Sequence, residues 1–453
     1  MKGVRWIPVA IAAVLVIVWV LVEWEGRDGA RRRAAEDVLA AIEPALPPAP
    51  EPLAAEHERL HDAAQRAWSY VERQTADGTG FVRAVPDYDV GTIWDIASAL
   101  AALHCARLLG LVEADGYADR MARALATLEA LPLVDGAAFN KTYLMADGRP
   151  TDRAGAVAAR GFGWSTLDIG RLLVWLRIIA THEQTHAPRI ARIVARLDME
   201  RLVANGYLRG GEALASGRIR TFQEGRLGYE QYAARGFQLW GATADRALDW
   251  TENAQPRDVF GQPLLGDRRA HGCLTSEPFL LSGLELGWDP QAFRLALGVL
   301  AAQRARWRET GALTLVSEDA SAAPPHYFYY YCVDLDGEPF AVTAQAQPIL
   351  PDAPRAISTK AAFAWYALAP GEYTSLALDS VMRTLAADST LPAGILESDG
   401  APAGPENINT AAVVLEAAVY ERTGRPLLHL RPRDLEALRA RTLSSGAPEP
   451  SHP

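Results

Sequence analysis

The sequence has few cysteines and lacks the common nucleotide-binding and zinc-binding motifs. Its 453 residues include only three cysteines, Cys105, Cys273 and Cys332, which are far apart and odd in number. We therefore expect reduced, packed thiols without a catalytic role. No Walker loop, Rossmann fingerprint or zinc-ligand spacing is present, so neither a metal nor an organic cofactor is implied. The net charge of -10 argues against a general nucleic-acid binder.

One long apolar run lies near the amino terminus. Residues 6–22 form 17 positions without a charge, at the short end of the length that spans a bilayer. No small-x-small cleavage site follows the run cleanly, which favours an uncleaved inner-membrane anchor. The Lys and Arg residues on its two sides favour a cytoplasmic body when counted alone.

The sequence predicts four parts along the chain. They are a transmembrane anchor over 1–30, a proline-rich spacer over 31–54, a globular domain over 55–443 and a disordered tail over 444–453. The spacer includes the proline-rich run 43–52, and the domain begins with an amphipathic helix over 54–74.

The domain is organised around residues 160–176, a polar, aromatic loop that leads into an apolar helix. Ser165 or Thr166 can cap this helix, and Asp168 lies in its first turn, where unpaired N–H groups favour a carboxylate. The same order of glycine or hydroxyl residue, acid or amide, and apolar helix recurs in five more segments. These are 91–103, 228–240, 275–285, 358–368 and 407–416.

Amphipathic segments with charged faces lie between most of these apolar helices, at 117–131, 188–202, 291–307 and 373–386. The alternation predicts an all-α fold, an (α/α)6 toroid with an inner and an outer ring of helices. A short β-hairpin insertion is predicted at 326–331. All six polar helix starts should open at one end of the ring; they lie at Asp95, Asp168, Glu230, Glu277, Lys360 and Asn409.

Acids, amides and aromatic residues stand together at these helix starts. Sugars present both hydroxyl groups and apolar ring faces, so a saccharide groove needs hydrogen-bonding groups beside flat aromatic side chains. The predicted substrate-binding residues are Trp94, Asn140, Lys141, Trp164, Tyr229, Tyr232, Glu277, Glu318, Lys360, Glu397 and Asn409.

Each of these residues also has a purely structural interpretation. Asp95 and Asp168 fit first-turn acids that satisfy helix N–H groups, and Glu277 before a proline fits an ordinary helix start. The pair Glu318 and Asp319 fits a solvated turn. The tyrosine run 327–331 fits a packed strand. Capping alone does not explain the aromatic residues beside the acids.

The segments 92–98, 160–168, 228–234, 276–281 and 357–363 together resemble a bacterial family called domain of unknown function 3131. The resemblance runs from about residue 81 to residue 420. That family resembles the (α/α)6 glucoamylase-like domains of β-1,2-glucanases and cyclic-glucan transglycosylases. The resemblance implies an extracytoplasmic toroid that binds or acts on a glycan, and it supplies no catalytic pair.

The sequence therefore favours an anchored, periplasm-facing protein that hydrolyses or transglycosylates a polysaccharide, with a β-linked glucan as the first choice. Cleavage of a glycosidic bond needs two carboxyl groups. We assign Glu230 as the general acid, because burial against Tyr229 and Tyr232 should raise its pKa, and an ionised Asp168 or Asp95 as its partner.

Two other functions fit the sequence. One is a non-catalytic glycan-binding or scaffolding subunit of an exopolysaccharide synthesis or export machine. The other is a cytoplasm-facing toroid that binds an isoprenoid or lipid intermediate, which would need an apolar central cavity.

Overall fold

The computed structural model describes residues 27–46, 54–269, 273–321, 326–333, 338–344, 350, 353–387 and 390–445. The predicted anchor at 6–22 and all but the first two residues of the predicted tail at 444–453 lie outside the described residues; residues 444 and 445 end a helix and so do not belong to a disordered tail. Within the described ranges, no helix combines the length and the apolar character needed to cross a membrane.

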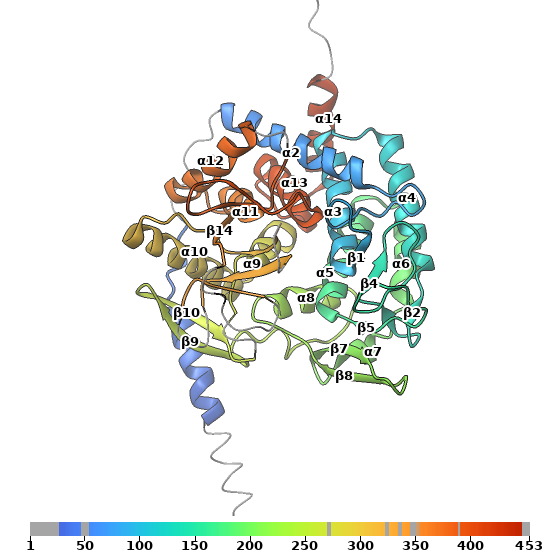
Figure 1. Ribbon diagram of the computed structural model, residues 1–453, viewed down its shortest axis with the longest axis horizontal. Coiled ribbons are helices and arrows are strands. Elements are labelled where there is room, and N and C mark those ends of the chain that lie inside the picture. Colours follow the sequence, from blue (N-terminus) through green and yellow to red (C-terminus); the bar gives the residue numbers. More distant parts are fainter. Residues whose placement is uncertain are drawn as a thin grey trace, which may run out of the picture.

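Six of the described helices form an inner ring (Figure 1). They are α3 (Ile93–Leu109), α5 (Thr166–His182), α8 (Tyr229–Gln238), α9 (Glu277–Leu281), α11 (Thr359–Leu368) and α13 (Ile408–Thr423). Each helix contacts the next in this order, and α13 contacts α3, so the ring closes. These helices are apolar on nearly all sides because neighbours surround them in the ring. They match the six apolar helices predicted from the sequence.

Amphipathic helices cover the ring from outside, with their charged faces in water. They are α2 (Ala54–Gln74), α4 (Ala114–Ala130), α6 (Ala187–Ala195), α10 (Pro290–Thr310) and α12 (Glu372–Ala387). The short helix α7 (Met199–Leu202) follows α6, and η2 (Leu427–His429) and α14 (Pro432–Ser445) follow the last inner helix. The predicted first helix at 54–74 is confirmed residue for residue.

The alternation of inner and outer helices is interrupted between α8 and α9. A hairpin of β9 (Ala254–Val259) and β10 (Gln262–Asp267) lies there instead of an outer helix. Its two loop residues, Phe260 and Gly261, have φ values of 52° and 70°. Positive φ at both positions is the geometry that joins twisted antiparallel strands tightly.

A helix over residues 27–41 packs beside this hairpin and α10. Ala35, Leu39 and Ile42 are buried on one face, at helical spacing. Arg294 of α10 donates a hydrogen bond to the carbonyl of Ile42 at 2.6 Å. The first part of the predicted 31–54 spacer is therefore a packed helix, because its apolar residues recur every three to four positions.

The prediction of an all-α fold with one hairpin needs correction, since short strands occupy most connections between helices. The sequence signal was weak because most of these strands have two or three residues, too few to show alternation. The described strands form six small sheets. Besides β9 and β10, they are β1 (Val90–Thr92), β2 (Leu133–Val134), β3 (Ala138–Phe139), β4 (Thr142–Leu144), β5 (Gly163–Trp164), β6 (Val203–Ala204), β7 (Tyr207–Ala213), β8 (Ile219–Gln223), β11 (Glu318–Ala320), β12 (Tyr327–Tyr331), β13 (Ala341–Thr343), β14 (Ala356–Ser358), β15 (Gly394–Leu396) and β16 (Pro402–Ala403).

Candidate functional site

The starts of the inner helices meet at one end of the ring. Asn409 at the start of α13 donates a hydrogen bond to Asp95 of α3 at 3.0 Å. Lys360 of α11 lies 3.0 Å from Glu277 of α9, and the Tyr229 hydroxyl of α8 donates to the same carboxylate at 3.0 Å. These bonds join α13 to α3 and join α11, α9 and α8 to one another. The rings of Trp94 of α3 and Tyr229 of α8 meet at 5.8 Å between the two groups, and the charge of Asp95 acts on Asp168 of α5. The predicted common end is confirmed, and we call it the ring mouth.

Asp95 is a capping residue in this arrangement. One carboxylate oxygen accepts hydrogen bonds from the backbone and the hydroxyl of Thr92, both at 2.8 Å, and the other accepts from Asn409. The side chain is only 6% exposed. Burial raises its pKa, and these donors oppose the rise. The carboxylate has no oxygen left for substrate, which agrees with the first-turn interpretation rather than with a catalytic one.

Asp168 is more open than Asp95. Ser165 caps α5 and donates to one oxygen of Asp168 at 3.1 Å, and the side chain is partly exposed. Burial and then the nearby charge of Glu224 raise the pKa of Asp168 to about 7. Burial, with the second carboxylate beside it, thus favours the protonated form of Asp168, whereas the sequence predicted an ionised one.

Glu224 follows strand β8 and is also partly exposed. One of its oxygens accepts from the backbone N–H of Thr166 at 2.5 Å and from the Thr166 hydroxyl at 2.9 Å. The carboxylate thus sits at the positive end of α5, next to Asp168. The charge of Lys141 opposes the rise in the pKa of Asp168. Its ammonium lies over the ring of Phe222, 5.9 Å from the centroid.

Glu230 lies beneath the loop that carries Glu224. Burial raises the pKa of Glu230 to about 7, as the sequence predicted in direction. Its two tyrosine neighbours point elsewhere, however, since helix positions 229, 230 and 232 face different sides. Arg269 donates to Glu230 at 2.6 Å and Gln223 donates at 3.4 Å, and the side chain is 1% exposed. A Cβ atom at Gly225 would lie 2.4 Å from the Glu230 carboxyl carbon, so the loop rests directly on it.

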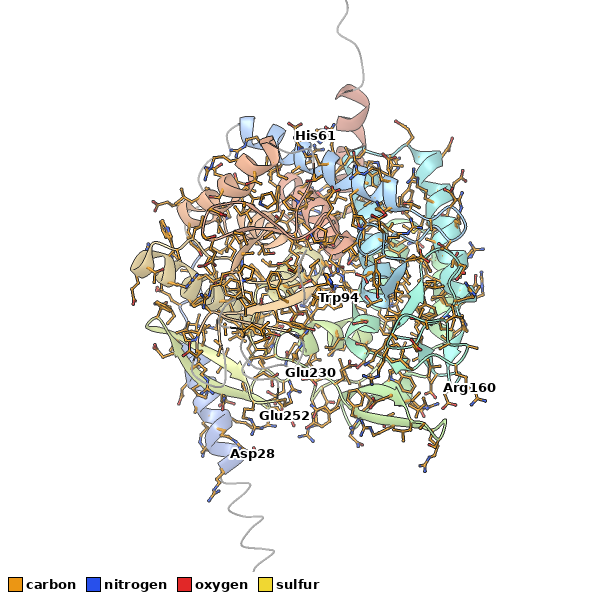
Figure 2. The ribbon with its side chains drawn as sticks, viewed as in Figure 1. Asp28, His61, Trp94, Arg160, Glu230 and Glu252 are labelled. Atoms are coloured by element: carbon orange, nitrogen blue, oxygen red, sulfur yellow. The ribbon has the colours of Figure 1, made fainter. Side chains whose placement is uncertain are left out.

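A closed ionic cluster fills the centre of the ring below Trp94, which Figure 2 labels near the middle of the view. Arg171 lies 3.1 Å from Glu285 and 3.3 Å from Glu416, and all three side chains are at most 1% exposed. The Arg171 guanidinium also lies over the ring of Trp94, 4.9 Å from its centroid. Burial and the neighbouring Glu285 raise the pKa of Glu416. This cluster is out of reach of a substrate.

The π-helical turn η1 (Ser282–Leu286) continues α9 and brings Glu285 into that cluster. Trp175 donates to Glu285 at 2.9 Å, and the Tyr232 hydroxyl donates to its other oxygen. Tyr232 is 1% exposed and therefore cannot serve as a sugar platform, although the sequence predicted it as one.

A second buried ionic cluster surrounds Lys360. Burial alone would lower the pKa of Lys360, but Glu277 and then Asp319 outweigh it, and the pKa is raised. The interpretation of Glu318 and Asp319 as a solvated turn is wrong, since both lie in β11 and are 3% and 4% exposed. Arg226 forms a two-pronged ion pair with Glu318.

Three other predicted contact residues do not face the mouth. Trp164 is 0% exposed, packs against Gly211 of β7 and donates to the carbonyl of Arg209 at 2.8 Å. Asn140 is also 0% exposed, and its amide is fully used by backbone groups within the loops. Glu397 pairs with Arg306 at 2.9 Å and accepts a hydrogen bond from the Tyr330 hydroxyl at 2.8 Å.

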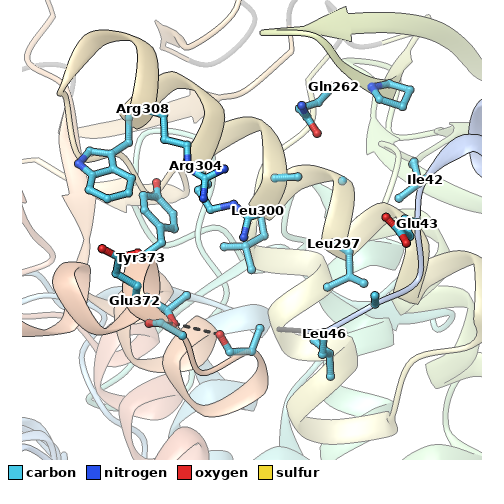
Figure 3. A pocket seen from close by; sticks show the side chains of 18 of the residues that line it. Ile42, Glu43, Leu46, Gln262, Leu297, Leu300, Arg304, Arg308, Glu372 and Tyr373 are labelled. Atoms are coloured by element: carbon cyan, nitrogen blue, oxygen red, sulfur yellow. Dashed lines mark hydrogen bonds between the residues drawn. The ribbon is translucent and has the colours of Figure 1, made fainter. Parts of the chain in front are cut away.

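One cavity lies away from the mouth, and the described residues hold no cluster of metal-ligand type. Among the described residues, no three His, Cys, Asp or Glu side chains are grouped to hold a metal ion. A cavity of about 620 Å³ lies on the outer side, between α10, residues 41–46 and the connection from α11 to α12. Figure 3 shows Arg304, Arg308, Glu372 and Tyr373 around it. It includes none of the predicted site residues.

Sequence reasoning missed Glu224, Arg171, Arg226 and Arg269. A charged residue inside an apolar helix must be paired, so Arg171 in the middle of α5 was a signal for a buried ionic cluster. Glu224 offered no such signal, because it lies in a loop whose place at the mouth depends on the pairing of β7 with β8.

The fold and the mouth define a helical toroid of a known sequence family. The chain belongs to the family described as protein of unknown function DUF3131, whose model matches residues 62–424. A comparison with curated proteins finds no match.

Several solved structures share the fold at low sequence identity. A predicted glucoamylase from Bacteroides caccae superposes with a TM-score of 0.61 at 15% identity, covering 85% of this chain and 98% of that one. An endo-β-1,2-glucanase from Chitinophaga pinensis, in complex with sophorotriose and glucose, gives 0.58 at 12% identity, covering 86% and 98%. A third, an endo-β-1,2-glucanase from Talaromyces funiculosus with β-1,2-glucan, gives 0.54 at 11%, covering 92% and 90%.

Proposed function

We propose that this chain is a glycoside hydrolase or transglycosylase that acts on a β-linked glucan at the ring mouth. The observation that carries the proposal is the pair of partly exposed carboxyl groups, Asp168 and Glu224, at the start of α5. Glycosidic cleavage needs one protonated and one ionised carboxyl group. Likeness of fold to proteins described as endo-β-1,2-glucanases supports the choice of glucan.

In this proposal Asp168 is the proton donor. Its pKa of about 7 keeps a large protonated fraction at neutral pH, and its second oxygen is free of the Ser165 bond. It can therefore donate to the leaving glycosidic oxygen. Glu224 is the ionised partner that activates water or an acceptor hydroxyl, with its second oxygen available. Lys141 and Trp94, both partly exposed, contact the sugar.

Glu230 changes role relative to the sequence assignment. A group that is 1% exposed and held by Arg269 cannot reach a bound sugar without giving up that ion pair. It supports the loop 223–225 from below and so positions Glu224. Glu230 is thus a positioning residue rather than the acid.

The side chains inside the ring distinguish an enzyme from a lipid-binding protein and from a scaffolding subunit. A lipid intermediate would need an apolar central cavity, whereas Arg171, Glu285 and Glu416 occupy the centre. A scaffolding subunit of an exopolysaccharide machine would need a glycan surface but no carboxyl pair. The open pair at the mouth therefore favours an enzyme.

The test is turnover on a panel of β-linked glucans, with release of reducing ends as the readout. The wild type should cleave or transfer at least one of them, and Asp168→Asn and Glu224→Gln should each lose nearly all turnover while still binding it. Glu397→Gln is the matched control, because that acid is paired with Arg306 away from the pair. Wild-type rates in Asp168→Asn would overturn the assignment, and binding without turnover in the wild type would favour the scaffold.

We also propose an inner-membrane anchor through residues 6–22 with the body in the periplasm. The uncharged apolar run and the proposed polysaccharide substrate support it. Alkaline phosphatase fused after Leu443 should be active in cells. An inactive phosphatase fusion, together with a fluorescent cytoplasmic reporter at the same position, would reverse the orientation.

A further inference from the structure

The strand β12 carries aromatic residues on both of its faces. Side chains alternate along a strand, so Phe328 and Tyr330 share one face and Tyr327, Tyr329 and Tyr331 share the other. Phe328 and Tyr330 are 8% and 0% exposed and belong to the core. Packing therefore explains the first face. It does not explain Tyr327, which is 41% exposed, or the partly exposed Tyr329.

This strand is fixed rigidly beside the ring mouth. The Thr275 hydroxyl donates to the carbonyl of Tyr330 at 3.0 Å, and the N–H of Cys332 donates to the carbonyl of Leu274 at 3.0 Å. Leu274 and Thr275 directly precede α9. Arg226, just before α8, pairs with Glu318 in the neighbouring strand β11 and donates to the Tyr331 hydroxyl at 3.3 Å. The sheet is thus tied to two inner helices at their mouth ends.

A chain of ring and guanidinium contacts leads from Trp94, through the buried Tyr229, to the exposed Tyr327. The ring of Trp94 lies 5.8 Å from that of Tyr229, and the Arg226 guanidinium covers Tyr229 at 4.5 Å. The same guanidinium lies 5.4 Å from the ring of Tyr329, which meets Tyr327 edge-on at 5.3 Å. Aromatic faces and guanidinium planes are the surfaces that apolar sugar faces stack on.

We infer that Tyr327 and Tyr329 form a second sugar-binding subsite, which stacks on a glycan unit remote from the bond being cleaved. The inference rests on the proposed function for the ligand, a β-linked glucan chain lying across the mouth. The fixed strand holds the rings in place before binding, so little rotamer freedom is lost. The subsite contributes to binding of long chains and takes no part in the chemical step.

The experiment compares long and short substrates in wild type, Tyr327→Ala and Tyr327→Phe. For a long glucan, Tyr327→Ala should raise KM about 5–10-fold at unchanged kcat, since the binding it removes is equal in ground and transition states. Tyr327→Phe keeps the ring and should stay within about twofold of wild type. A disaccharide that does not reach the subsite should show no change. Leu376→Ala, a 40% exposed apolar residue on the outer helix α12, is the control.

The same variants separate this inference from the proposed function. If Tyr327→Ala turns over the long glucan with an unchanged KM, the subsite is wrong and the proposed enzymatic function stands. The wild type could instead bind a glycan on an array without turning it over. If Tyr327→Ala weakens that binding, the result would support the subsite and overturn the proposed enzymatic function. No binding of any glycan by the wild type would overturn both. If Tyr327→Ala unfolds, Tyr327→Leu carries the same comparison, because it removes the flat ring and keeps an apolar side chain.

Discussion

Asp168 and Glu285 are both carboxylic acids on inner helices of one ring, yet their surroundings differ completely. Glu285 is 0% exposed and is held by Arg171, Trp175 and the Tyr232 hydroxyl. Asp168 is partly exposed and has a single short-range donor, Ser165, with another carboxylate beside it. The surroundings of Glu285 stabilise its negative charge. Those of Asp168 leave one carboxylate oxygen free and place a second carboxylate beside it.

This difference shows which acids can do chemistry. A buried acid with every oxygen bonded contributes to the unique packing of the ring and has no capacity for substrate. A catalytic pair needs environments that push two acids towards different protonation states. Only the mouth pair, among the predicted acids and their described neighbours, combines access with that electrostatic conflict. The presence of an acid therefore does not identify the site; the acid must also be accessible to a substrate.

The largest effect is expected at the open pair. Asp168→Asn keeps the shape but removes the proton donor, so kcat/KM on a confirmed glucan should fall about 10²–10⁴-fold. Circular dichroism at the same temperature should remain unchanged, since Ser165 still caps α5. A fall of less than tenfold would mean that Asp168 is not the acid.

At the closed cluster the effect should appear in stability. Arg171→Met leaves Glu285 and Glu416 without their cation, and breaking a buried ion pair in this way costs about 3–5 kcal/mol of unfolding free energy. Chemical denaturation measures this directly. Adding Glu285→Gln to Arg171→Met removes the carboxylate that lay 3.1 Å from the lost cation and should recover part of the loss. Additive losses in the double variant would show that the cluster is not coupled.

The sequence predicted the ring well because its signals are local. Four of the six inner helices begin with a side-chain cap, Thr92, Ser165, Ser358 or Asn407, close to the start that the sequence predicts. The hairpin between α8 and α9 interrupts the alternation, because the hydrophobic periodicity of the inner helices does not require an outer helix between each consecutive pair.

The site was predicted less well because it depends on which way side chains turn. Trp164 and Asn140 lie in a polar loop and yet point inwards, where backbone groups satisfy them. Glu224 reaches the mouth through strand pairing that no local pattern encodes. The acids near the helix starts thus located the mouth. Choosing between Asp168 and Glu230 as the proton donor required the burial and the hydrogen bonds that the structure shows.

The dependence of activity on pH should distinguish these two acids. With Asp168 as donor, kcat/KM should fall about tenfold per pH unit above a pKa of about 7, as the donor loses its proton. Glu230 has a pKa of about 7 as well, so the wild-type profile alone does not decide. Glu230→Gln should lower the rate less than tenfold and leave the alkaline limb in place. Loss of that limb in Glu230→Gln would return the acid role to Glu230.

The smallest effect is a pH-dependent change in stability. The folded pKa of Asp168, about 7, lies above its unfolded value of about 3.9, so its contribution is full below pH 4 and is lost as the pH rises towards 7. Asp168→Asn removes this loss. Because the side chain is partly exposed, we expect only a small effect: the stability of Asp168→Asn relative to wild type should rise by about 1 kcal/mol, or roughly 2 °C in Tm, between pH 5 and pH 8.

Asp434 provides a control of opposite sign. Hydrogen bonds from Arg431 lower the pKa of Asp434 to about 2, so its contribution is present above pH 4 and is lost as the pH falls towards 2. Asp434→Asn should therefore lower Tm at both pH 5 and pH 8, by similar amounts. Asp168→Asn should instead raise Tm more at pH 8 than at pH 5. Parallel Tm shifts in the two variants would show that Asp168 is not held protonated in the folded protein, and the open pair would then lose its electrostatic distinction from the closed cluster.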